Sequence, residues 1–135
     1  IKNEMKIFIL INSIVFLLYG IGFMFFTETL SLYVIDTVPN TKSGLIDMRA
    51  TYGGMSIGFA LLLYLTSQDS KIFVLGVKSI ILIVGGMALG RFTGIIKEGS
   101  PNTLMYIYLL LEVLVVLIGV KLLAKSYKIS NPTSS

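Results

Sequence analysis

The chain has 135 residues, of which 55% are hydrophobic and 13% are charged, and its formal net charge is +4. A soluble domain of this size leaves much of its surface in water and cannot bury such an apolar excess, so the composition predicts an integral membrane protein. The absence of Cys and His excludes disulfides and thiol nucleophiles and removes the commonest general base and metal ligand. We therefore expect neither a metal nor a cofactor. The basic residues lie at the ends of apolar segments, where membrane topology explains them, so nucleic acid is not an expected partner.

Four apolar runs follow one another along the chain. A helix needs about 20 residues to cross a hydrocarbon core of about 30 Å, and each run is close to that length or longer. We therefore predict an all-α integral membrane protein in which residues 1–135 form a single antiparallel four-helix bundle. The predicted helices cover about residues 7–26, 48–65, 72–96 and 104–124.

The connections between these runs differ in length. Residues 66–71 and 97–103 form short turns, so the helices that they join are expected to be antiparallel neighbours. Residues 27–47 form a long outer loop, whose apolar stretch 30–35 is expected to lie at the membrane interface or to cap the bundle. Residues 126–135 are polar and are expected to form a flexible tail.

The basic residues indicate the orientation of the chain. If both termini lie on one side, seven basic residues lie there and four lie on the other side. Because Lys and Arg favour the cytoplasmic side, both termini are predicted to be cytoplasmic. The first group is Lys2, Lys6, Lys71, Lys78, Lys121, Lys125 and Lys128, and the second is Lys42, Arg49, Arg91 and Lys97.

Small residues recur at a spacing of four in the second and third runs. Stripes of this kind let helix backbones approach closely in lipid. We expect them to form contacts within the bundle, and the alternatives are a dimer interface or the close approach of a ligand. The two stripes are Ala50, Gly54 and Gly58, and Gly86, Gly90 and Gly94.

Ionisable residues within the apolar runs mark a candidate site. Glu112 lies eight residues after Leu104, about 12 Å along the fourth helix at 1.5 Å per residue. A charge inside a membrane is costly unless it has a partner. We therefore predict that Glu112 pairs with Arg91, Arg49 or both.

Two tyrosines are expected to complete this polar cluster. Tyr52 follows Arg49 by three residues, and Tyr108 precedes Glu112 by one turn. In one interpretation the cluster is a structural clasp between helices. In the other it lines a cavity that binds a polar head group or relays protons.

The residues around these charges resemble a known family. The runs Asp47-Met-Arg-Ala-Thr-Tyr-Gly-Gly54 and Ala88-Leu-Gly-Arg91, together with Glu112, are similar to domain-of-unknown-function family 4345. The resemblance extends from the first helix to about Leu123, and it implies a multi-pass protein of the bacterial inner membrane. The outline also resembles, more weakly, the DoxX-type four-helix membrane proteins, some of which are described as partners of quinol oxidases.

These observations favour a non-enzymatic bundle that binds a lipid or small amphiphile, or an accessory subunit of a larger membrane complex. Membrane lipids are then the expected partners, with a larger membrane complex or a homo-oligomer as further partners. One alternative is an enzyme in which Glu112 acts as acid or base while Arg49 and Arg91 hold an anion. Without His, Cys or a metal site, such an enzyme has few groups to use. The other alternative is a small proton-coupled transporter, since carboxylates within a membrane mark proton paths.

Overall fold

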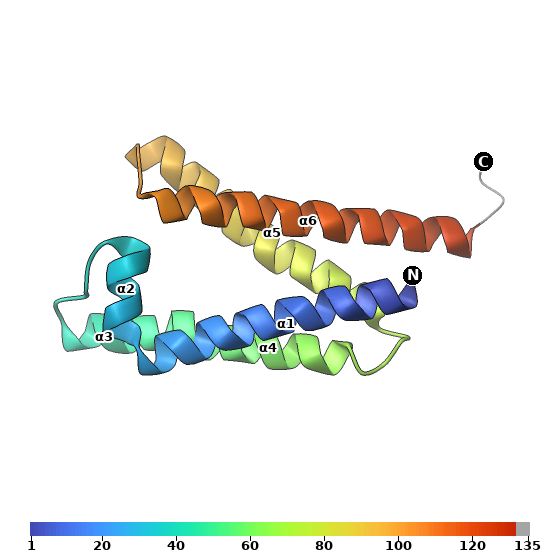
Figure 1. Ribbon diagram of the computed structural model, residues 1–135, viewed down its shortest axis with the longest axis horizontal. Helices are drawn as coiled ribbons and strands as arrows, with labels where there is room; N and C mark the ends of the chain where they lie inside the picture. Colours follow the sequence, from blue (N-terminus) through green and yellow to red (C-terminus); the bar gives the residue numbers. More distant parts are fainter. Residues whose placement is uncertain (132–135) are drawn as a thin grey trace.

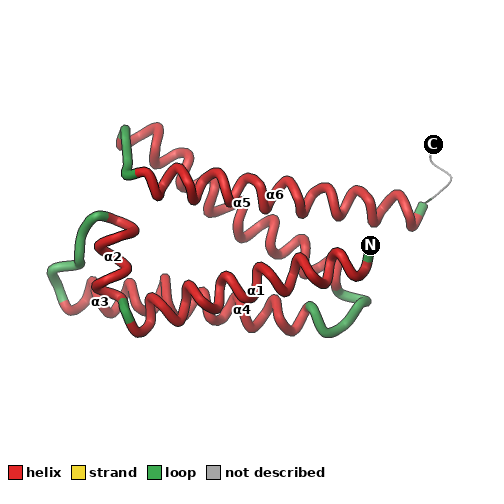
Figure 2. Tube along the Cα trace, viewed as in Figure 1, coloured by secondary structure: helices red, strands yellow, loops and turns green. Residues whose placement is uncertain are grey.

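The computed structural model describes residues 1–131, and every regular element in that part of the chain is helical (Figure 1 and Figure 2). Three of the helices, α1, α5 and α6, are long and apolar enough to cross a membrane. The elements are α1 (Lys2–Phe25), α2 (Thr27–Ile35), α3 (Lys42–Met48), the π-helix η1 (Arg49–Gly54), α4 (Met55–Thr66), α5 (Phe73–Glu98) and α6 (Thr103–Ser130).

The elements α3, η1 and α4 form one continuous helical rod from Lys42 to Thr66. The backbone keeps helical angles at both junctions, with φ −63° and ψ −38° at Arg49 and φ −63° and ψ −39° at Met55. The second apolar run therefore lies within an unbroken rod. The π-turn in its middle winds more residues into each turn than an α-helix does, and such turns are often found at functional sites.

The segment 27–47, expected as a loop, contains α2 and all of α3 except its last residue, Met48. The chain bends at Phe26 (φ −122°, ψ 40°) before α2 starts, and α2 ends at Asp36 in the left-handed conformation (φ 60°, ψ 16°). α2 has no clear apolar period, but its Thr27 and Ser31 side chains are buried and donate to the carbonyls of Phe23 and Glu28. Tertiary packing therefore makes this segment helical where its local pattern predicts a loop.

The last helix continues beyond its expected end. α6 begins after Asn102, whose side chain accepts a hydrogen bond from the backbone N–H of Met105 at 3.1 Å. It ends at Ser130, so residues 126–130 of the expected flexible tail are helical. Residues 132–135 of that tail lie outside the described part of the chain.

The helices form two pairs, α1 with η1 and α4, and α5 with α6 (Figure 1). We call the end that carries the start of α1, the end of α6 and the α4–α5 turn the terminal end, and the end that carries α2, α3 and the α5–α6 turn the far end. The two pairs meet at the terminal end, where a hydrophobic core forms. Its buried residues are Met5, Phe8, Ile9, Leu63, Phe73, Val77, Ile80 and Val84.

A close backbone contact between α1 and the rod depends on Gly20 and Gly53. A Cβ atom on Gly20 would lie 2.8 Å from the Gly53 carbonyl oxygen and from the Ile57 nitrogen, and a Cβ atom on Gly53 would lie 3.0 Å from the Met24 nitrogen. The predicted stripes do not make this contact. A Cβ atom would meet nothing within 4 Å at Gly58, Gly86, Gly90 and Gly94, and only a Met24 side-chain atom at 3.9 Å from Gly54, while Ala50 is exposed. Close packing of these stripes within the bundle is therefore not seen, because a spacing of four identifies a stripe but not the direction in which it faces, and the dimer-interface and ligand alternatives stay predictions.

Candidate functional site

A cleft of about 720 Å³ lies between the two helix pairs in the far half of the molecule. This volume falls within the range of about 300–1,000 Å³ that is usual for small-molecule sites. The apolar walls include Val15 and Phe16 of α1, Phe59 of α4, and Leu111 and Val115 of α6. The polar residues that line the cleft are Asn12, Tyr19, Thr51, Tyr52, Ser56, Arg91, Tyr108 and Glu112.

Arg91 and Glu112 form an ion pair across α5 and α6. The Arg91 Nε atom donates to Oε1 and Oε2 of Glu112 at 3.2 and 3.1 Å, and Nη2 donates to Oε1 at 2.8 Å. Both residues lie about equally far from the short α5–α6 turn, so the antiparallel arrangement of the two helices brings them to the same level. Glu112 is 7% exposed, and the guanidinium compensates the buried carboxylate, as the cost of an isolated buried charge requires.

Aromatic side chains extend this pair across the cleft. The Arg91 guanidinium lies 5.1 Å from the centre of the Tyr108 ring, at cation–π distance. The Tyr19 ring of α1 meets the Tyr108 ring edge to face at 6.4 Å between centres. Phe23 then contacts both Tyr19 and Tyr52, at 4.8 and 5.1 Å between ring centres. The aromatic rings therefore connect η1 to the ion pair on the opposite helix pair.

Arg49 does not belong to this cluster. Its Nε atom donates to Thr27 Oγ1 at the start of α2, at 3.2 Å, and it is not among the described residues that line the cleft. Tyr52 does line the cleft. A π-turn winds more residues into each turn than an α-helix does, so the spacing of three between Arg49 and Tyr52 does not by itself imply a shared face here. Of the two partners proposed for Glu112, the structure brings Arg91 to it.

Tyr19 and Met105 are cleft residues that the sequence-based prediction missed. Met105 accepts a hydrogen bond through its sulfur from Arg91 Nη1 at 3.1 Å. Tyr19 is the one tyrosine in the first apolar run. A single hydroxyl-bearing aromatic residue within an apolar helix could have marked it as a candidate site residue. The direction in which it points depends on how α1 packs, which the sequence pattern does not give.

The far end of the cleft is bordered by α2. Val34 and Ile35 of this helix line the cleft. Asn102, at the start of α6, donates through Nδ2 to the Val34 carbonyl oxygen at 3.1 Å and to Asp36 Oδ2 at 3.0 Å. One side chain therefore caps α6 and ties α2 to the α5–α6 turn.

The fold and the cleft define a class: an all-helical protein with apolar helices of membrane-spanning length and a largely apolar cleft, with one polar cluster, between two helix pairs. The chain belongs to the family described as Domain of unknown function (DUF4345), whose pattern matches residues 5–123. This confirms the family that the sequence motifs indicated, and the matched region contains every cleft residue named above. No curated protein and no solved structure matches the chain. The likeness to DoxX-type proteins is not among these findings.

Proposed function

We propose that the protein is a non-enzymatic membrane bundle that binds a lipid or another small amphiphile in the cleft. The polar head would lie at Arg91 and Glu112, and the tail would lie between the helix pairs. One observation carries the proposal: the same cleft joins a single polar cluster to long apolar walls. An amphiphile has this division of polar and apolar surface, and pockets for small molecules combine apolar walls with a few placed polar groups.

The proposal includes four crossings of a bacterial inner membrane by an antiparallel bundle. Three helices have the required length and apolar character, and the rod from Lys42 to Thr66 contains the second apolar run. The terminal end carries the larger group of basic residues, so both termini would be cytoplasmic and the far end would face the periplasm. The bacterial inner membrane follows from the kind of protein that the family resemblance implies.

Binding explains the polar cluster better than catalysis or proton transport does. An acid–base group must be able to take up and release a proton during turnover. Both oxygens of Glu112 accept hydrogen bonds from Arg91, which holds the carboxylate in its ion pair. If Glu112 instead serves an enzyme or a transporter, Glu112→Gln abolishes turnover or pH-dependent flux in liposomes.

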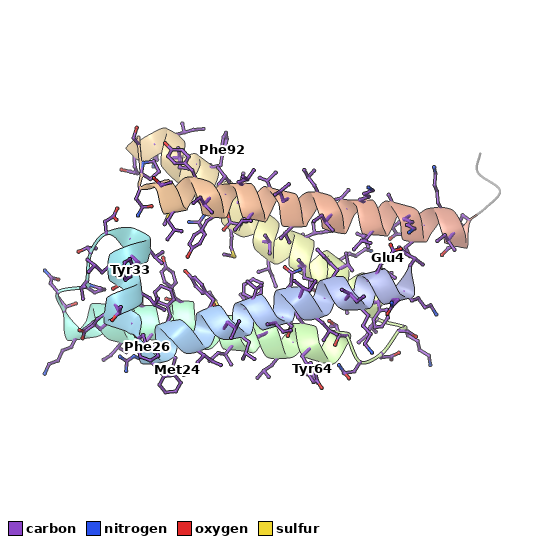
Figure 3. All side chains as sticks on the ribbon, viewed as in Figure 1. Glu4, Met24, Phe26, Tyr33, Tyr64 and Phe92 are labelled. Atoms are coloured by element: carbon purple, nitrogen blue, oxygen red, sulfur yellow. The ribbon has the colours of Figure 1, made fainter. Side chains whose placement is uncertain are left out.

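The apolar exterior supports an accessory role as a second candidate. Phe92 and Tyr64 project from opposite sides of the molecule (Figure 3) and are 52% and 50% exposed. In a membrane such side chains face either lipid tails or the helices of a partner. A protein that copurifies in fixed stoichiometry would identify this chain as a subunit of a larger complex.

Native mass spectrometry of the protein, extracted from membranes in mild detergent, tests amphiphile binding. The variant Gly86→Leu places a side chain in the cleft, and a Cβ atom at Gly86 meets nothing within 4 Å, so the helices need not move. Gly58→Leu is the matched control, because Gly58 is equally free of neighbours but does not line the cleft.

We expect a bound lipid on the wild-type protein and on Gly58→Leu, and its loss from Gly86→Leu. Wild-type protein without any bound amphiphile would contradict the proposal. Equal retention by both variants would show that lipid binds elsewhere on the protein.

A further inference from the structure

The charges that line the cleft cancel each other. Within the described part of the chain, Arg91 and Glu112 are the two charged residues that line it, and they are bonded to each other. On another side of Arg91, a recess of about 290 Å³ at the ends of α5 and α6 is lined in addition by Glu98. The guanidinium is therefore accompanied by acidic residues in both hollows, and the cleft offers no uncompensated positive charge.

A charged head group would disturb this balance. An anion bound to Arg91 would either lie beside the Glu112 carboxylate or take Arg91 away from it. The first arrangement brings like charges together, and the second leaves a carboxylate that is 7% exposed without its partner. Removing one partner of a buried pair is strongly unfavourable. A cationic head meets the same difficulty at Arg91.

An uncharged head, in contrast, finds one donor and one acceptor in place. Arg91 Nη1 donates to the Met105 sulfur at 3.1 Å, and a thioether is a weak acceptor that a carbonyl oxygen can replace. Glu112 Oε2 accepts one of the three N–H contacts from Arg91. A carboxylate has about four lone-pair sites, so Oε2 retains capacity for a ligand hydroxyl.

From this arrangement we infer that the cleft selects an uncharged amphiphile whose head carries both a hydroxyl group and a carbonyl oxygen, as a glycerol monoester of a fatty acid does. The inference rests on the proposed function and names the ligand class for the same cleft. The carbonyl oxygen accepts from Arg91 Nη1, the hydroxyl donates to Glu112 Oε2, and the ion pair stays intact. The acyl chain lies along the apolar walls, which include Phe16 and Phe59.

Three probes with an 18-carbon monounsaturated tail and different heads test the inference on the full-length protein in detergent. They are 1-monooleoylglycerol, oleate and oleylamine, titrated separately and read by native mass spectrometry as the fraction of protein that carries the probe. We expect 1-monooleoylglycerol to bind at least about tenfold more tightly than either charged probe. The reason is that the free-energy cost of leaving a buried charge unpaired exceeds the free energy that corresponds to a tenfold change in affinity.

A charge-changing variant gives a second, independent reading. Glu112→Gln leaves Arg91 without its counter-charge, so the preference should shift towards oleate by about tenfold or more. Glu4→Gln is the matched control, because it removes the same charge from an exposed pair with Lys125 at the terminal end, and its preference should equal that of the wild-type protein.

The outcomes separate this inference from the proposed function. Wild-type protein that prefers oleate or oleylamine overturns the uncharged class and leaves amphiphile binding standing. Wild-type protein that binds none of the three probes overturns the uncharged class, and if it also carries no copurified amphiphile it overturns the proposed function as well. The affinities of the wild-type protein for the three probes test the ligand class even if Glu112→Gln does not fold.

Discussion

The guanidinium of Arg91 and the carboxylate of Glu112 meet across α5 and α6 through three N–H···O contacts of 2.8 to 3.2 Å. The pair lies in the wall of the cleft and also joins two long apolar helices. We expect the pair to affect stability and, under the proposed function, ligand selection, and the two effects can be measured separately.

Breaking the pair from one side should destabilise the protein more than removing both partners. Arg91→Met leaves the buried Glu112 carboxylate unpaired, which should cost about 3–5 kcal/mol in the free energy of unfolding. The double variant Arg91→Met with Glu112→Leu removes that charge, so it should recover most of the loss. Unfolding in detergent, followed by circular dichroism, measures these two variants and the single variant Glu112→Leu, which completes the cycle.

The Glu4–Lys125 pair serves as the control for this cycle. Its distance is 2.7 Å, but both side chains are about half exposed, and Glu4 lies between the ends of α1 and α6 (Figure 3). An exposed pair of this kind should show a coupling of less than about 1 kcal/mol. Additive effects of the Arg91 and Glu112 substitutions would show that their contact carries no coupling.

The contact between α1 and the rod should be sensitive to a single methyl group. Gly20→Ala places a Cβ atom 2.8 Å from backbone atoms of Gly53 and Ile57. Because these are backbone atoms, the clash is relieved only if α1 and the rod move apart. We expect a loss of about 1–3 kcal/mol in unfolding free energy. Gly58→Ala meets no neighbour and should be neutral or stabilising by up to about 1 kcal/mol, because Ala favours helix over Gly. Equal stability of the two variants would refute the close contact.

The proposed orientation can be read by labelling single cysteines, since the natural chain has none. Ser70 lies in the α4–α5 turn and Ser100 in the α5–α6 turn, and both are exposed. In intact spheroplasts, a membrane-impermeant maleimide should label Ser100→Cys, whereas Ser70→Cys should react only after permeabilisation. The reverse pattern would place the termini outside, and equal labelling of both would contradict an odd number of crossings between the two turns.

The connection between α2 and α6 should control the mobility of α2. Asn102→Asp keeps the acceptor that caps α6 but loses both donor contacts and faces Asp36 with a like charge. We expect faster hydrogen exchange in α2 and a loss of about 1 kcal/mol or more in the free energy of its opening. Combining Asn102→Asp with Asp36→Asn supplies a donor from the other side and should restore part of the protection. Unchanged exchange in Asn102→Asp would show that α2 is held by its packing alone.

The sequence alone predicted much of the helical framework, for a physical reason. A membrane helix needs an apolar run of a given length, so α1, α5 and α6 can be read from composition along the chain, with ends that differ by a few residues. The pairing of Glu112 with Arg91 was also within reach, because a buried acid requires a counter-charge and Arg91 lies at a matching distance from the same turn. The family assignment depended on short motifs in order along the chain.

Other features depended on contacts between segments that no local pattern encodes. Arg49 donates to Thr27 at the start of α2 instead of pairing with the acid. α2 is tied to the start of α6 by Asn102, which donates to the Val34 carbonyl oxygen.

What the sequence by itself determined is which segments are apolar enough for a membrane and which charge must find a partner, because both follow from the free energy of transfer of single groups. Only the tertiary structure decided which face each helix turns to its neighbours. It placed Gly20 and Gly53 in the helix contact, brought Gly86 and Tyr19 to the cleft, and thereby set the shape of the candidate site. The physical reason is that helix rotation depends on the packing of all neighbours together, which spacing along one segment does not specify.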